Sequence, residues 1–79
     1  MDFTKLGETI AKVRKEKRMS QQQLALDLHI SRATISSFEN GNGVDIGLKK
    51  VLAILDYLGY EIALKEKSKF PSFEELLDE

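Results

Sequence analysis

Residues 19–41, MSQQQLALDLHISRATISSFENG, constrain the fold most, because one pattern of helix-starting residues occurs there twice. In the first copy Ser20 is a favourable N-cap, and Gln23 stands at the capping-box position three residues later. Met19 before the cap and Leu24 after it are spaced to form a hydrophobic staple. These signals predict the start of a short helix and fix the direction from which the chain enters it.

The second copy of the pattern lies eleven residues later, where Ser31 is the cap and Ile30 and Ile35 are spaced as the staple. We therefore predict two short helices joined by a tight turn. Their apolar residues fall at helical spacing and should bury together. These residues are Leu24, Ala25, Leu28, Ile35 and Phe38.

The motifs SQQQLA, SRATIS and FENG resemble the helix-turn-helix of the Cro/C1-repressor (Xre) family over about residues 6–64. The resemblance implies an all-α, lambda-repressor-like bundle of four to five short helices. Two positions depart from the family pattern. His29 stands where the turn between the helices usually has glycine, and Arg18 stands where glycine often follows the first helix. Histidine tolerates a positive φ better than most residues do, and neither position faces DNA by the resemblance.

Two further helices are predicted on either side of this pair. Leu6, Ile10 and Val13 follow helical spacing, which predicts a first helix over about residues 4–17. After a glycine-rich stop at residues 40–43, we expect Asp45 to cap a fourth helix over about residues 46–58. The predicted core face of this helix comprises Leu48, Val51, Leu52 and Leu55.

Residues 60–67, which follow Gly59, begin with alternating apolar and polar side chains and predict a short strand. No other strand is evident, so its backbone groups need a partner, and the same strand of a second copy is the economical one. The predicted interface of this homodimer comprises Ile54, Tyr57, Leu58, Tyr60, Ile62 and Leu64. A Cro/C1-type domain followed by such a strand is similar to the HipB antitoxins, whose dimers share a C-terminal strand. That resemblance implies a HipA-like Ser/Thr kinase toxin as partner.

The composition of these 79 residues is compatible with DNA binding in spite of a net charge of −1. Residues 1–69 carry 12 basic and 9 acidic groups, so a mildly basic region precedes an acidic tail. We interpret residues 1–59 as the DNA-binding domain and 60–67 as the dimerising strand. For the tail at residues 68–79, a disordered end and a short helix both remain open. We expect the tail to be repelled by DNA and to dock on a protein surface, with the toxin as the candidate.

Other function classes find little support in the sequence. The chain has no cysteine and one histidine, with no carboxylates placed to complete a catalytic or metal cluster, so we expect no enzyme, metal or cofactor. The absence of a signal peptide and of a long apolar run leads us to expect a cytoplasmic protein. Two other functions remain open: a free-standing repressor without a toxin, and a protein-interaction adaptor with little DNA affinity.

Double-stranded operator DNA is the expected partner, read by the second helix of the pair. The outward residues, predicted to contact bases, are Arg32, Ala33, Ser36 and Ser37. Arg32 suits the O6 and N7 atoms of guanine, although a solvent-exposed arginine is the alternative. Gln21, Ser31, Thr34 and Asn40 are the predicted phosphate contacts, Gln21 and Asn40 through the family resemblance. The resemblance also implies an ion pair between Arg14 and Glu39, with a surface arginine as the alternative.

Overall fold

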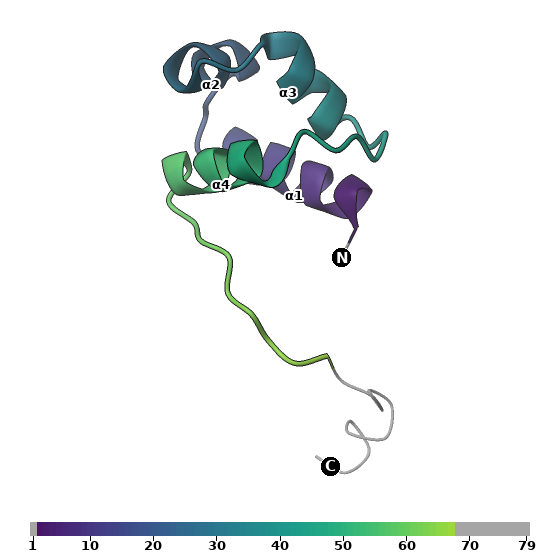
Figure 1. Cartoon of the computed structure of the whole chain (residues 1–79). Helices are drawn as coiled ribbons and strands as arrows, with labels where there is room; N and C mark the ends of the chain where they lie inside the picture. Colours follow the sequence, from purple (N-terminus) through teal and green to yellow (C-terminus); the bar gives the residue numbers. More distant parts are fainter. Residues whose placement is uncertain (1, 68–79) are drawn as a thin grey trace.

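The computed structural model describes residues 2–67, and all regular secondary structure within them is helical. The four helices are α1 (Phe3–Glu16), α2 (Gln21–Leu28), α3 (Arg32–Glu39) and α4 (Leu48–Tyr57). Helices α2 and α3 lie together on one side of the body, and α1 and α4 lie on the other (Figure 1). The predicted all-α class is confirmed. No helix of residues 2–67 is long and apolar enough to cross a membrane.

The predicted caps of α2 and α3 are both formed. The hydroxyl oxygen of Ser20 accepts a hydrogen bond from the backbone N–H of Gln23 at 3.0 Å, and Ser31 accepts one from that of Thr34 at 3.0 Å. Each bond satisfies a donor that the first turn of a helix leaves without a partner. His29, at the end of α2, has φ of 57°, so it adopts the left-handed conformation that the tight turn requires.

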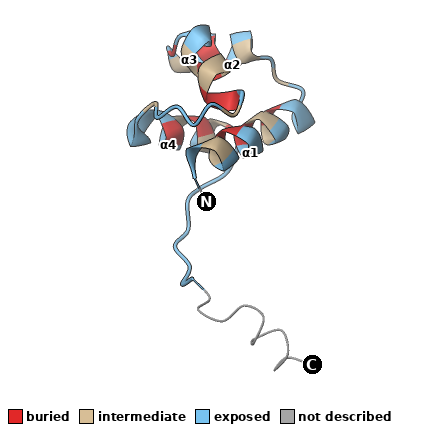
Figure 2. Cartoon of the chain, turned by 90° about the vertical axis from the view of Figure 1, so that its right-hand side faces the viewer, coloured by how far each residue is buried: buried red, intermediate tan, exposed pale blue. Residues whose placement is uncertain are grey.

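The core lies between the two pairs of helices, where the buried residues of Figure 2 converge. Four of the five apolar residues predicted to be shared by α2 and α3 are buried, and the fifth, Leu28, is partly buried against them. Burial of these side chains is the main term that holds such short helices together. The buried apolar set is Ile10, Leu24, Ala25, Ile30, Ile35, Phe38, Val51, Ile54 and Leu58.

Helix α1 crosses the end of α3 at Gly7, which is buried. A Cβ atom built on Gly7 would lie 1.9 Å from the carbonyl oxygen of Phe38. The obstacle is backbone, which cannot move aside as a flexible side chain can. Only glycine therefore allows α1 and α3 to approach this closely.

The predicted start of α4 was wrong by two residues. Gly47, with φ of 92°, is the N-cap and has no side chain to accept a hydrogen bond from the first turn. Asp45 instead accepts a hydrogen bond from the N–H of Gly47 at 2.8 Å, so its carboxylate closes the turn before the helix. An aspartate two residues before a glycine favours such a turn as well as a cap, and the turn is formed here.

The predicted core face of α4 was right for Val51 and Leu55, which lie in or against the core, and wrong for Leu48 and Leu52. Leu48 is 67% exposed and Leu52 is 44% exposed, whereas Ile54 and Leu58 are fully buried together with Val51. Apolar residues surround most of this helix, so two different stripes have helical spacing. Packing against α2 selects the stripe that contains Ile54 and Leu58.

Residues 60–67, called the arm below, leave the end of α4 on the side of the body opposite α2 and α3 (Figures 1 and 2). Within the single chain the arm is exposed and forms no strand, so the predicted strand is not present there. A strand without a partner leaves its hydrogen-bonding groups unpaired, which explains why the sequence pattern alone does not produce one. The predictions for residues 68–79 lie outside the described residues.

Candidate nucleic-acid interface

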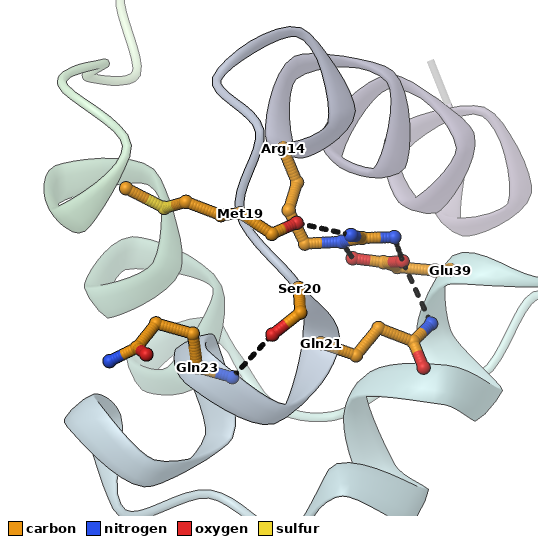
Figure 3. A network of polar contacts seen from close by, with 6 residues as sticks. All are labelled: Arg14, Met19, Ser20, Gln21, Gln23 and Glu39. Carbon is orange, nitrogen blue, oxygen red and sulfur yellow. Dashed lines mark hydrogen bonds and ion pairs between the residues drawn. The ribbon is translucent and has the colours of Figure 1, made fainter.

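The predicted ion pair between Arg14 and Glu39 is formed, and it fixes α3 against α1 (Figure 3). The Nε and Nη2 atoms of Arg14 donate to the two carboxylate oxygens of Glu39 at 2.8 and 2.9 Å. Both residues are only 7% exposed. A two-pronged contact between a planar guanidinium and a carboxylate is among the most direction-dependent interactions in proteins. It therefore sets the angle at which α3 is held.

The same network also holds the start of α2. The Nη1 atom of Arg14 donates to the carbonyl oxygen of Met19 at 2.6 Å, immediately before the Ser20 cap. The side-chain amide of Gln21 donates to Glu39 at 3.0 Å (Figure 3). An amide nitrogen carries two hydrogens, so one N–H of Gln21 remains for a phosphate oxygen. Three helices thus meet in one polar cluster, and Gln21 is positioned by it.

The outward surface of α3 presents the four predicted base-contacting residues in two shallow recesses. Arg32, Ala33 and Ser36 line one recess of about 350 Å³. Ala33 also lines a second recess of about 400 Å³, together with Thr34 and Ser37. Arg32 and Ala33 are exposed, and the two serines are half-buried. A short helix with one long donor in its first turn can enter a DNA major groove and meet base edges there.

Residues 10–65 match the sequence profile of the helix-turn-helix family. The chain belongs to the Cro/C1-type helix-turn-helix family. Neither the curated proteins nor the solved structures gave a match. Family membership indicates a sequence-specific DNA-binding regulator in which α3 is the recognition helix. The matched residues include α2, α3, α4 and most of the arm.

At the start of the recognition helix, the hydroxyl groups of Ser31 and Thr34 contact each other at 2.8 Å. Two hydroxyls carry two hydrogens, and their mutual hydrogen bond uses one of them. One donor is left, and it lies beside the exposed N-terminal turn of the recognition helix. At the other end of this helix, Asn40 is an exposed C-cap. The phosphate contacts predicted for these residues stay predictions.

The residues predicted from the sequence to contact DNA did not include the lysines of α4, one of which lies beside the outward surface of α3. Lys50 lines the second recess, with Val44, Asp45 and Ile46 of the loop before α4. Lys49 and Lys50 are both exposed in the first turn of α4. The sequence signal that could have found them is the pair Lys49–Lys50, which comes directly after the loop that follows α3.

A second polar contact ties the helix-turn-helix to α4. The phenol of Tyr57 donates to the carboxylate of Asp27, which also accepts a hydrogen bond from the side-chain amide of Gln23 at 2.9 Å. The hydrogen bond from Tyr57, and to a lesser extent that from Gln23, stabilises the carboxylate and lowers the pKa of Asp27. The same contact raises the pKa of Tyr57, because ionisation of the phenol would lose its hydrogen bond to a carboxylate.

The predicted dimer residues fall into two groups in this DNA-binding domain. Ile54 and Leu58 belong to the core of the single chain, so assigning them to a dimer interface was wrong. Tyr60 and Ile62 are each 50% exposed and Leu64 is 98% exposed. The sixth residue, Tyr57, is half-buried. The apolar side chains of the arm therefore lie free of the core.

Proposed function

We propose that this chain is a homodimeric operator-binding repressor of the HipB-like antitoxin kind, without catalytic activity or a cofactor of its own. The observation that carries the DNA-binding part is the outward surface of α3. It is exposed at Arg32 and Ala33, and the Arg14–Glu39 ion pair holds the helix in one orientation. A recognition surface has to be fixed before binding, because a loosely held helix loses entropy when it docks.

In this proposal, base reading and phosphate binding are separate tasks. Arg32 reads guanine, Ala33 packs on a thymine methyl group, and Ser36 and Ser37 donate to base edges. Gln21, Ser31, Thr34 and Asn40 donate to phosphates and set the register of the protein on the duplex. The free N–H of Gln21 and the free hydroxyl hydrogen of the Ser31–Thr34 pair support these roles.

The proposed dimer forms through the arm and the exposed stripe of α4. Tyr60, Ile62 and Leu64 recur at every second residue, so they share one face of an extended chain. Antiparallel pairing with the arm of a second copy would satisfy the backbone groups of both. Leu48 and Leu52 stand exposed one helical turn apart on α4 and extend the apolar surface available to the dimer.

The HipA-like kinase toxin is proposed as the protein partner because the arm directly after the helix-turn-helix domain resembles the HipB arrangement. Co-purification with the product of the neighbouring gene tests this assignment. A complex that survives gel filtration supports the toxin–antitoxin module. Recovery of the dimer alone, together with specific binding to its own promoter, identifies a free-standing repressor instead.

Two alanine variants test the division of labour on DNA. Arg32→Ala should weaken binding and relax the preference at one base pair in each half-site, where a good bidentate contact is worth about 1–3 kcal/mol. Gln21→Ala should weaken binding to all sequences alike. Both are measured on a panel of single-base variants of the promoter fragment, with Lys12→Ala on α1 as a control for lost positive charge.

The stability of Gln21→Ala has to be measured beside its DNA affinity, because its amide also contacts Glu39. Equal, sequence-independent losses for Arg32→Ala and Gln21→Ala would contradict the division. An absence of salt-dependent binding to any duplex would contradict DNA binding itself and leave the adaptor function.

Truncation after Gly59 tests the proposed dimer. It removes the arm but leaves all four helices and the whole buried core. We expect a monomer or a weaker dimer in sedimentation, and a lower operator affinity because two half-sites are no longer held together. A truncated chain that remains dimeric at micromolar concentration would show that the arm does not hold the dimer.

A further inference from the structure

A groove of about 420 Å³ lies between the turn that joins α2 to α3 and the first half of α4. Apolar side chains of Leu28, Ile30 and Ala53 contribute to its lining, and Lys49, Lys50 and His29 add basic groups. We call it the basic groove. Neither the ion-pair network nor the proposed dimer uses it. An apolar lining with positive charge suits a segment that carries both acidic and large apolar side chains.

Residues 70–79 of the same chain have this composition. They contain four acidic residues, four large apolar residues and no lysine or arginine. The apolar residues are Phe70, Phe73, Leu76 and Leu77, and the acidic ones are Glu74, Glu75, Asp78 and Glu79. We propose that this acidic segment docks in the basic groove of its own chain and restrains DNA binding.

The segment has enough chain to reach the groove. In a chain whose arm is not paired with a second copy, residues 60–69 connect it to Gly59, and ten extended residues span up to about 33 Å. The groove lies beside the first half of α4, and the whole of this ten-residue helix is about 15 Å long. A tether of ten residues holds its end at an effective concentration in the millimolar range. A contact that is weak between separate molecules is therefore populated within one chain.

Docking of the acidic segment would compete with DNA because Lys50 belongs to two surfaces. It lines the basic groove, and it also lines the recess beside Ala33 and Ser37 on the recognition helix. Four negative charges at this place repel phosphates and neutralise lysines that would otherwise attract them. This consequence rests on the proposed DNA-binding function, whereas the docking itself does not.

A spin label tests the docking without DNA. The chain has no cysteine, so Ser72→Cys introduces a single attachment site in the acidic segment and leaves its charges intact. In isotope-labelled full-length protein we expect relaxation broadening of the amides of residues 28–30 and 47–53. Lys49→Glu with Lys50→Glu should abolish it, whereas Lys12→Glu with Lys15→Glu on α1 should not.

Two results of this measurement would overturn the proposal. One is the absence of broadening at the basic groove in the chain with its native lysines. The other is equal broadening in a mixture where the label and the isotope are on different copies, which would place the segment on a second copy. A separate measurement adds the purified protein partner. Broadening that appears at the groove only then would assign the segment to a complex with that partner and also contradict docking within the free chain.

The effect of docking on DNA affinity is measured with a random-sequence duplex, because docking is expected to weaken attraction to phosphates, which does not depend on sequence. We substitute Glu74→Gln, Glu75→Gln, Asp78→Asn and Glu79→Gln together, and expect about threefold to tenfold tighter binding at low salt. The matched control changes the exposed residues Glu8, Glu16, Glu61 and Glu66 to glutamine, which alters the net charge equally. Equal gains for both would indicate net charge and contradict restraint by docking. A chain that binds no duplex in any form would refute the proposed function, while the label still decides the docking.

Discussion

The helix-turn-helix at residues 19–41 and the segment from residue 44 to residue 67 differ in how much of their apolar surface the chain covers. Leu26 is the one large apolar residue exposed in the first, whereas six are exposed in the second. In the first, the staple residues and the buried faces of α2 and α3 are covered by the chain itself. Its polar groups are also satisfied, and no buried side-chain N or O atom among the described residues lacks a hydrogen-bond partner. In the second, Leu48, Leu52 and Leu64 remain exposed to solvent.

This difference agrees with the proposed functions, in which the first region presents to DNA a surface that one chain completes and the second assembles with another copy. The reading surface for DNA has to be held rigidly, and local caps together with the Arg14–Glu39 pair achieve this. An assembly surface is covered only when its partner is present, so the monomer leaves it exposed. Substitutions in the two regions should therefore change different properties.

The largest loss of stability is expected from Arg14→Ala. It leaves the buried carboxylate of Glu39 without its guanidinium and removes the donor to the Met19 carbonyl, which should lower the free energy of unfolding by about 3–5 kcal/mol. Urea unfolding monitored by circular dichroism measures it. Arg32→Ala is the matched control, because it removes an exposed arginine and should change stability by less than about 0.5 kcal/mol. Similar losses for the two arginines would mean that the pair does not hold the helix-turn-helix together.

The two faces of α4 give the next prediction. Ile54→Ala opens a cavity in the core and should lower the free energy of unfolding by about 2–5 kcal/mol. Leu52→Ala truncates a side chain on the exposed face of α4. It should lower the free energy of unfolding by less than about 1 kcal/mol and weaken the proposed dimer instead. Urea unfolding and sedimentation of both variants separate the two effects. A larger stability loss for Leu52→Ala would show that α4 presents its other stripe to the core.

A smaller but distinct loss is expected from Gly7→Ala. The added methyl group meets the carbonyl of Phe38, so α1 and α3 must move apart, at a cost of about 1–3 kcal/mol. At an unhindered helical site the same change would stabilise the helix by up to about 1 kcal/mol, so the sign of the effect is itself the test. Thermal unfolding beside Glu8→Ala, an exposed neighbour, measures it. An increase in the melting temperature of Gly7→Ala would contradict the close crossing.

The helix-turn-helix could be predicted from the sequence because its signals are local. A cap such as Ser20 or Ser31 and a turn residue such as His29 act on backbone groups a few positions away, so their spacing is sufficient evidence. The Arg14–Glu39 pair joins residues 25 positions apart, and it was reached only through the family resemblance. Geometry of that kind depends on how α1 packs on α3, which no short pattern records.

The buried face of α4 could not be fully predicted from the sequence for a related reason. Its apolar residues lie on more than one face, so periodicity cannot decide between Leu52 and Ile54, and only tertiary packing selects the buried one. Gln23 shows the same limit on a smaller scale. Its spacing fits the reciprocal half of a capping box, yet its side-chain amide binds Asp27, which the phenol of Tyr57 on α4 also contacts. A contact between distant helices thus settles what the local pattern left undecided.

The contact between Asp27 and Tyr57 gives the smallest predicted effect, and it is expressed in the pH dependence. The pKa of Asp27 lies below its ordinary value of 3.8 in the folded chain, so its contribution is present above that pH and disappears as the pH falls through the lowered pKa. The pKa of Tyr57 lies above its ordinary value of 10.0, so its contribution is present below that pH and disappears as the pH rises through the raised pKa. Between these limits the stabilisation should be constant.

Tyr57→Phe removes the donor, so its stability difference from the parent chain should be level from about pH 5 to about pH 9 and shrink on either side. Urea unfolding at a series of pH values measures this difference. Tyr60→Phe is the matched control, because within residues 2–67 the phenol of Tyr60 makes no hydrogen bond and its ring, which lies under the Lys17 amine, is retained. The helix-turn-helix is tied to α4 through this contact, so Tyr57→Phe should also loosen α2 relative to α4. A stability difference that does not change with pH would show that the phenol and the carboxylate are not linked in solution.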